Sequence, residues 1–269
     1  MEFKYRIFVP GGNTTALVLG IETDINTRKI IQDWILQKHK DVEQVGFVSK
    51  DFLKPELMMT GGEFCGNATR CAVHYYLNAM PGDISLKVSG VNKPLSAGIT
   101  DTFETWTQMP VYESIDKITF VDDGIYYAEI EGISHLVVSQ RQSIPFLENI
   151  KEKGKVKQMA KWLLERYDFY KGNACGVIFT ENVLDIIKIH PCVFVVTAET
   201  SYYETACGSG CVAVGLVNAI LYGESVCLHL LQPSNHVIKT YVEYIDGIVK
   251  AAKISGLVTV GQEFSGGDV

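Results

Sequence analysis

Short alternations of hydrophobic and polar positions recur along the chain, and they predict a protein built largely of β-strands. Apolar positions with helical spacing interrupt these alternations in a few longer segments. The predicted strands cover residues 5–9, 15–19, 44–49, 118–121, 125–129, 136–139, 177–180 and 193–197. The predicted helices cover residues 27–39, 68–78, 156–167 and 210–221.

Two segments share one pattern. FCGNATRC occupies positions 64–71 and ACGSGC occupies positions 206–211. In each, a Cys-Gly pair precedes an apolar helical run, then a turn, then a strand-like run at 84–90 or 226–232. The two motifs lie about half a chain apart, which predicts two homologous α+β halves, residues 1–118 and 119–269. We expect each half to be a curved, mostly antiparallel or mixed sheet around one central helix, with the active site in the cleft between them.

The composition is that of an ordinary globular protein, with 47% hydrophobic and 20% charged residues. The formal net charge is −7 and no block of Lys or Arg occurs, which argues against nucleic-acid binding. The longest uncharged apolar-rich run, 211–223, is shorter than the roughly 20 residues that span a bilayer. Glu2 and Lys4 interrupt any secretion signal. We therefore expect a cytoplasmic protein with a small-molecule partner and neither a nucleic-acid nor a membrane partner.

Seven cysteines, an odd number without a secretion signal, predict free thiols rather than a disulfide framework. Cys65 and Cys207 each stand at a predicted helix start, where unpaired N–H groups favour a thiolate and can bind a carboxylate. Two such starts facing each other would place one thiol on either side of an α-carbon. One would remove the α-proton and the other would return a proton to the opposite face. Burial as small core residues is the alternative, whereas no CxxC or HxxxH spacing supports zinc.

These motifs resemble the two active-site segments of diaminopimelate epimerase and its relatives, the pyridoxal-independent two-cysteine racemases. PGGNTTALV at 10–18, EQVGFV at 43–48 and GISHLVV at 132–138 resemble further family segments in the same order. The resemblance implies a diaminopimelate epimerase-like fold, a thiol pair that needs no cofactor or metal, and a homodimer in some relatives.

Carried over by position, the resemblance implies that Cys65 and Cys207 are the catalytic acid–base pair. It implies that Asn13 and Gln44 line the substrate pocket and that His135 supports the second cysteine.

The resemblance also assigns the substrate carboxylate to backbone N–H groups at the two helix starts, those of Gly66, Asn67, Gly208 and Ser209. The acidic partner of the family histidine falls at Glu199 or at Glu204, depending on the register of the alignment.

Several positions depart from diaminopimelate epimerase. Thr60, Ile133 and Ala174 replace asparagines that hold the distal end of its substrate, and Glu199 or Thr200 replaces its arginine. A site without these partners should reject a second buried carboxylate, so diaminopimelate is disfavoured.

The wider resemblance is greatest to the histidine racemase group, which shares GxEFCGNAT, EQVGF, CGSG and a glutamate at position 204. Glu43 is the candidate partner of the substrate imidazole, and we expect Arg70 to form a surface or interhalf ion pair. The sequence therefore predicts interconversion of L- and D-histidine.

Other functions stay open. Within the isomerases they are racemisation of another α-amino acid, such as lanthionine, a basic amino acid or a proline-type ring, or the phenazine-pathway type, which lacks the cysteine pair. Outside them they are a thiol redox or metal-binding protein using Cys65 with Cys71 or Cys207 with Cys211, and a binding module with a vestigial site.

Overall fold

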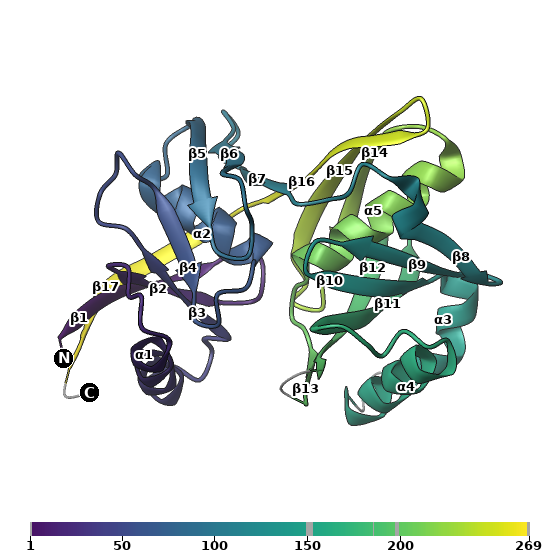
Figure 1. Ribbon diagram of the computed structural model, residues 1–269, viewed down its shortest axis with the longest axis horizontal. Helices are drawn as coiled ribbons and strands as arrows, with labels where there is room; N and C mark the ends of the chain where they lie inside the picture. The colour runs from purple at the N-terminus through teal and green to yellow at the C-terminus, as the bar shows by residue number, and fades with distance from the viewer. Residues whose placement is uncertain (1, 149–152, 185, 197–198, 268–269) are drawn as a thin grey trace. The chain divides into compact units, whose positions relative to one another are not determined.

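The chain folds into two compact units (Figure 1), seen in a computed structural model that describes residues 2–148, 153–184, 186–196 and 199–267. The first unit comprises Met1–Gln108 and Ser255–Val269, and the second comprises Met109–Ile254. This division differs from the expected one in two ways. It falls about ten residues before position 118, and the C-terminal segment joins the first unit.

The first unit holds a mixed sheet and two helices, α1 (Ile25–Lys38) and α2 (Gly66–Tyr76). Its strands are β1 (Phe3–Val9), β2 (Thr15–Leu19), β3 (Gln44–Val48), β4 (Glu56–Met59), β5 (Gly82–Val88), β6 (Leu95–Ile99), β7 (Thr105–Met109) and β17 (Thr259–Gly266). β17 comes from the end of the sequence and pairs antiparallel with β1. The C-terminal segment therefore completes the sheet in which the chain begins.

The second unit also holds a mixed sheet. Its helices are α3 (Gln140–Leu147), α4 (Lys153–Arg166), α5 (Gly208–Tyr222) and the short 3-10 helix η1 (Ile115–Lys117). Its strands are β8 (Ile118–Asp122), β9 (Ile125–Ile130), β10 (Ile133–Val138), β11 (Ala174–Val183), β12 (Ile186–Val195), β13 (Thr200–Tyr203), β14 (Val226–Leu231), β15 (Val237–Ile245) and β16 (Ile248–Gly256), the last of which extends into the boundary with the first unit.

The two units share one order of strand pairing. In the first, β1–β2 is antiparallel, β2–β3 parallel, β3–β4 antiparallel, β4–β5 parallel and β5–β6 antiparallel. In the second, the same alternation runs through β9–β10, β10–β11, β11–β12, β12–β14 and β14–β15. The parallel pairs need crossover connections, which α1 and α2 supply in the first unit and α3–α4 and α5 in the second. This agreement is what a duplicated half would produce.

Helices cover both faces of each sheet, which explains why the strands are apolar on both sides. In the first unit, α2 packs on a core that contains Leu17 and Leu57, and α1 packs on the opposite core, which contains Val45 and Phe47. In the second unit, α4 packs against residues such as Val177. α5 packs against β9, β10 and β15. Each motif cysteine therefore precedes a helix that is buried in its own unit.

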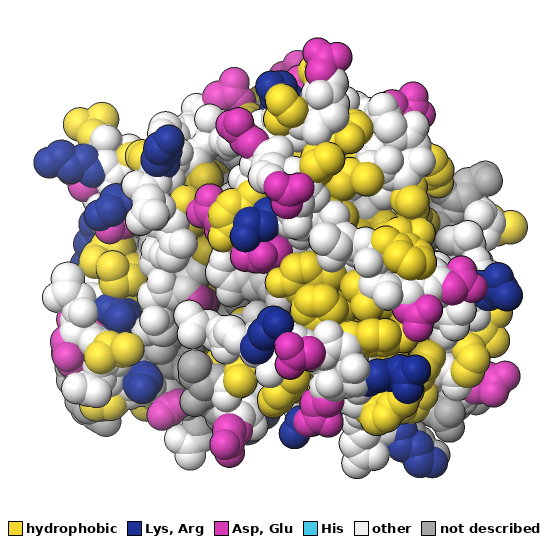
Figure 2. Space-filling model, turned by 45° about the vertical axis from the view of Figure 1, so that its right-hand side comes forward, with side chains coloured by type: hydrophobic (Ala, Val, Ile, Leu, Met, Phe, Trp, Pro, Cys, Tyr) yellow, Lys and Arg dark blue, Asp and Glu magenta, His cyan; other side chains and the backbone are white. Residues whose placement is uncertain are grey.

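The face drawn in Figure 2 exposes hydrophobic, basic and acidic side chains. Lys and Arg lie among Asp and Glu, and hydrophobic side chains gather toward the centre of the view. Among the described residues, no helix has both the length and the apolar character that crossing a membrane requires.

Candidate active site

Cys65 occupies the N-cap of α2, as the motif predicted. Its extended backbone (φ −138°, ψ 113°) turns the chain into the helix that begins at Gly66. Its Sγ accepts a hydrogen bond from the Ala68 N–H at 3.5 Å, so the sulfur lies at the positive end of the helix. The thiol is partly exposed and donates to the Gln44 side-chain oxygen at 3.2 Å.

A chain of hydrogen bonds extends from this thiol. The Gln44 side-chain N–H donates to the Thr15 hydroxyl at 2.8 Å. That hydroxyl donates to the main-chain carbonyl of Asn13 at 2.9 Å. Asn13 itself adopts a left-handed backbone (φ 54°) in the connection between β1 and β2. The structure thus brings Asn13, Gln44 and Cys65 together and adds the fully buried Thr15, which the sequence analysis missed.

Asn67 and Arg70 lie in the first turns of α2 and are almost completely buried. One Arg70 nitrogen donates to the Pro10 carbonyl at 2.6 Å and to the Asn67 side-chain oxygen at 2.9 Å. The expectation that Arg70 lies at the surface is therefore wrong. The guanidinium instead ties α2 to the segment that carries Asn13, because its planar fork can reach two acceptors.

Glu43 directly precedes β3, and Thr60 directly follows β4, the strand that pairs with β3. Glu43 is exposed, and its carboxylate accepts a hydrogen bond from the Thr14 N–H at 3.4 Å. Thr60 is buried, and its hydroxyl donates to the Val45 carbonyl at 3.0 Å. In this structure the Thr60 hydroxyl therefore binds the main chain of the neighbouring strand β3.

Cys207 occupies the N-cap of α5 in the same way (φ −131°, ψ 104°). Its Sγ accepts from the Gly210 N–H at 3.3 Å, and its own N–H donates to the Gln232 side-chain oxygen at 3.0 Å. The fully buried Gln232 also donates to Cys211 Sγ and to the Leu230 carbonyl. Gln232 directly follows β14, at the end of the strand-like run at 226–232, and was not predicted as a site residue.

His135 contacts the second helix start through Ser209. The His135 Nε2 lies 2.9 Å from the Ser209 hydroxyl, and that hydroxyl lies 3.4 Å from Cys207 Sγ. The imidazole is fully buried, and burial lowers the pKa of His135 to about 3, so the ring is neutral at physiological pH. Gly176, paired with His135 across β10 and β11, makes room for the ring, since a Cβ there would lie 2.6 Å from Nδ1.

The two candidate carboxylates differ in their surroundings. Glu199 is exposed in the turn between β12 and β13, with a left-handed backbone (φ 51°). Glu204 is partly buried, and its N–H donates to the Pro191 carbonyl at 3.0 Å. Burial raises the pKa of the nearby Cys192 to about 12, with smaller contributions from Lys157, which lowers it, and from Cys207 and Glu204, which raise it. Cys207 and Glu204 both lie near enough to Cys192 to raise the pKa of its thiol slightly.

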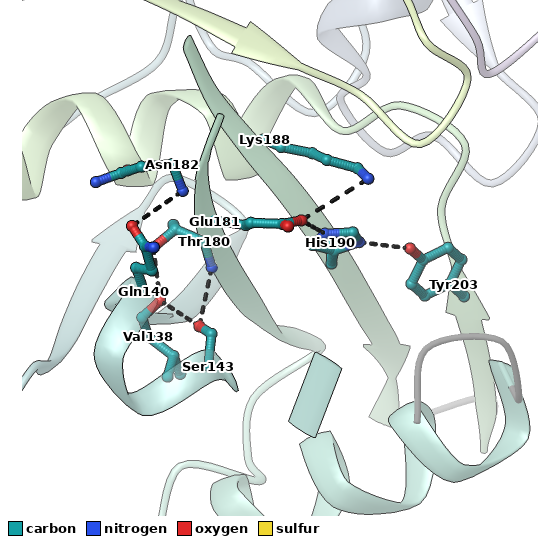
Figure 3. A network of polar contacts seen from close by, with 9 residues as sticks. All are labelled: Val138, Gln140, Ser143, Thr180, Glu181, Asn182, Lys188, His190 and Tyr203. Carbon is teal, nitrogen blue, oxygen red and sulfur yellow. Dashed lines mark hydrogen bonds and ion pairs between the residues drawn. The ribbon is translucent and has the colours of Figure 1, made fainter. Parts of the chain in front are cut away.

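A polar network fixes the strands that lead to Cys207 (Figure 3). The buried His190 contacts the Tyr203 hydroxyl through Nδ1 at 2.8 Å and the Glu181 carboxylate through Nε2 at 3.3 Å. Lys188 pairs with the same carboxylate at 3.8 Å. Burial lowers the pKa of His190, and Glu181 partly offsets this. These contacts tie β11, β12 and β13 together just before Glu204.

Neither the cysteines nor their neighbours form a metal centre in the part of the chain that the structure describes. No group of three or more His, Cys, Asp or Glu side chains there could hold a metal ion. All seven cysteines are free thiols. A pocket of about 360 Å³ lies in the second unit, but it is lined by residues from the second half of α5, such as Val214 and Leu221, whereas Cys207 precedes its first turn.

Comparison with known proteins places these features in context. Residues 2–264 match a family model described as the histidine racemase CntK N-terminal domain. A histidine racemase of Fusobacterium nucleatum is 27% identical over 257 residues, covering 90% of this chain and 91% of the relative.

Solved structures show a similar fold. A phenazine biosynthesis protein of the PhzF family from Bacillus anthracis has a TM-score of 0.66 at 12% identity, covering 98% of this chain and 99% of that one. A hydroxyproline epimerase from Agrobacterium vitis has a TM-score of 0.57 at 11% identity, covering 98% and 92%. The fold is thus a mixed α+β fold of the PhzF and hydroxyproline epimerase type.

Proposed function

This chain belongs to the histidine racemase family that the CntK N-terminal domain model describes, and from this premise we propose that it interconverts L- and D-histidine. The protein is an isomerase of the racemase or epimerase class. The observation that carries the proposal is the family match over residues 2–264, combined with a cysteine at the N-cap of each motif helix.

The proposed mechanism uses two thiols and no pyridoxal phosphate. The α-carboxylate of histidine binds N–H groups at the helix starts, those of Gly66, Asn67, Gly208 and Ser209, where the helix dipole favours an anion. One cysteine thiolate takes the α-proton and becomes a thiol. The other thiol gives its proton to the opposite face and becomes a thiolate, so the stereocentre inverts while the total charge and proton count stay constant.

We also propose that the fold consists of two pseudo-symmetric halves of the diaminopimelate epimerase type. The shared order of strand pairing in the two units supports it. The substrate pocket lacks the amide groups that diaminopimelate needs, because Thr60, Ile133 and Ala174 stand at those positions, and it lacks the guanidinium, because Glu199 or Thr200 replaces the arginine.

Glu43 is the proposed partner of the substrate imidazole. Glu43 directly precedes Gln44, and its carboxylate is exposed, so it is accessible to accept a hydrogen bond from a ligand. An imidazole donates an N–H in either protonation state, so a carboxylate suits it at any physiological pH. Glu43→Gln should raise KM for histidine several-fold with little effect on kcat, and steady-state kinetics will measure both.

We also propose a cytoplasmic location and a homodimer. Seven free thiols suit a reducing compartment. Cell fractionation and sedimentation of the purified protein test these two proposals independently of activity.

The decisive experiment is proton NMR of the purified, reduced protein with L-histidine in deuterated buffer, without added pyridoxal phosphate, followed by chiral chromatography. Loss of the α-proton signal together with the appearance of D-histidine is the expected result. Exchange with a different amino acid only would overturn histidine as the substrate and keep the chemistry.

The thiol pair has its own test. Cys65→Ser and Cys207→Ser should each abolish racemisation, because each leaves only one acid–base group. Cys227→Ser is the matched control, since Cys227 is the exposed cysteine on β14. Near wild-type racemisation in either of the first two variants would refute the pair.

A further inference from the structure

The two motif cysteines have different hydrogen-bond partners, although their backbones are alike. The Cys65 sulfur accepts from the Ala68 N–H and faces the side-chain oxygen of Gln44. The Cys207 sulfur faces the Gly210 N–H and the Ser209 hydroxyl. These different partners bear on which of the two cysteine sulfurs carries a proton.

The orientation of the Gln44 amide is fixed by Thr15. The Thr15 hydroxyl donates to the Asn13 carbonyl and accepts from the Gln44 side-chain N–H. Gln44 therefore turns its NH₂ group toward Thr15 and its oxygen toward Cys65. An amide oxygen accepts only, so the Cys65 sulfur facing it must carry the proton.

The orientation of the Ser209 hydroxyl is fixed by His135. Nδ1 of this buried, neutral ring has no hydrogen-bond partner among the described residues, whereas Nε2 contacts Ser209. A buried N–H without an acceptor is rarer than a buried acceptor without a donor, so the proton belongs on Nε2. Nε2–H then donates to Ser209, and the Ser209 O–H points to Cys207.

The first unit has different residues at the corresponding positions. Leu17 pairs with Gly46 across β2 and β3, as His135 pairs with Gly176 across β10 and β11. A leucine thus stands where the second unit has its histidine. The counterpart of Ser209 is Asn67, whose side-chain oxygen accepts from Arg70.

From these contacts we propose that, in the substrate-free protein, Cys65 is the thiol and Cys207 is the thiolate, with Thr15 and Ser209 as the positioning residues that set this difference. The inference rests on the proposed function for its catalytic meaning, because Cys207 is then the base of the first half-turnover. Each turnover moves the proton from Cys65 to the product and the α-proton to Cys207. The free protein then returns to its resting state by proton exchange with water.

The test is thiolate absorbance near 240 nm, measured against pH on the reduced full-length protein. It requires no catalysis, so its failure is distinct from failure of the racemase assay. Burial raises the pKa of Cys71 and Cys192 to about 12 and also raises the pKa of Cys175, so these thiols contribute little at neutral pH. At pH 7 the band should persist in Cys65→Ser and disappear in Cys207→Ser. The reverse pattern, an equal loss in both, or no band in the wild type would overturn the proposal.

Paired variants test the two positioning residues. Ser209→Ala should raise the midpoint of the Cys207 thiolate band by about one pH unit, the shift expected for loss of one hydrogen bond to a charged group. Thr15→Val frees the Gln44 amide to turn its N–H groups toward Cys65, so a second thiolate should appear near neutral pH.

The conservative variants Ser209→Thr and Thr15→Ser keep the hydroxyls and should restore the wild-type titration. Circular dichroism of all four variants checks folding. An unchanged titration in folded Ser209→Ala or Thr15→Val would overturn the role of that residue. Equal titration curves for Thr15→Val and Thr15→Ser would show that the hydroxyl does not set the proton position.

Discussion

Individual residues at this site act largely through contacts with their neighbours. His135 is the clearest case, because its imidazole is fully buried and reaches Cys207 only through Ser209. Its environment also keeps it neutral, since burial lowers its pKa to about 3. A neutral imidazole can orient the Ser209 hydroxyl but supplies no positive charge near Cys207.

His135 should therefore contribute to the pH dependence of stability. Its folded pKa, about 3, lies below the unfolded value of about 6.5, so the unfolded state binds the extra proton as the pH falls. The stability contribution is complete above about pH 6.5 and decreases below it, at up to about 1.4 kcal/mol per pH unit. Urea unfolding from pH 7 to pH 4.5 will show a shallower decrease for His135→Leu than for the wild type.

Gly176 should tolerate no side chain. A Cβ there would lie 2.6 Å from His135 Nδ1 and 2.9 Å from the Cys192 carbonyl. Gly176→Ala should lower the free energy of unfolding by about 1–3 kcal/mol, as overpacking does, and reduce racemisation by displacing the ring. Gly261→Ala is the control, because its Cβ would have its nearest neighbour at 3.5 Å. Equal denaturation midpoints for the two variants would contradict the steric argument.

At the level of elements, the periodicity of hydrophobic positions was sufficient to predict the helices and the strand that carry the site residues. The helices behind Cys65 and Cys207 and the strand at 15–19 were predicted to within two residues. The expected strand at 177–180 proved to be part of the longer β11. The one expected at 193–197 overlaps the end of β12 at 193–195, and residue 197 lies outside the described residues.

Elements without clear periodicity were missed. β4, β6, β7, β13 and β15–β17 were not predicted, because they are short, rich in exposed polar residues or not strictly alternating. α3 contains Pro145, which disfavours a helical reading. Thr15, Gly176 and Gln232 could not be recognised as site residues, since only tertiary pairing brings them near the cysteine helices.

Gln232 should matter for the start of α5. It fixes the Cys207 N–H and the Cys211 sulfur, and Gln232→Leu leaves the buried N–H without its acceptor. We expect a loss of about 1–3 kcal/mol of stability and a fall in kcat larger than any change in KM. Gln232→Glu keeps an acceptor for the Cys207 N–H and should recover part of kcat. Identical kcat values in the two variants would show that this hydrogen bond has no part in positioning Cys207.

For the whole molecule, the principal feature is that the two units share one order of strand pairing but carry different side chains at paired positions. The second unit places His135 and Gly176 where the first places Leu17 and Gly46. The two units thus share the order of strand pairing, whereas the side chains around the two cysteines differ. The two units also differ in continuity, because the first contains residues from both ends of the sequence.

Removal of residues 255–269 should therefore damage one unit selectively. β1 would lose its partner β17, so hydrogen exchange of β1 amides should accelerate strongly. Protection in α5 and β11, in the second unit, should persist. Uniform loss of protection across both units would contradict independent stability of the second.

The pairing of β1 with β17 also bears on synthesis. The second unit, Met109–Ile254, is continuous in sequence, so it can fold as soon as it has emerged from the ribosome. The N-terminal segment emerges earlier, yet β1 must wait for Thr259–Gly266 before its outer edge is paired. During that interval β1 is an open strand edge, the kind of surface that invites aggregation. Nascent chains stalled before residue 255 should therefore be the ones that bind chaperones most strongly.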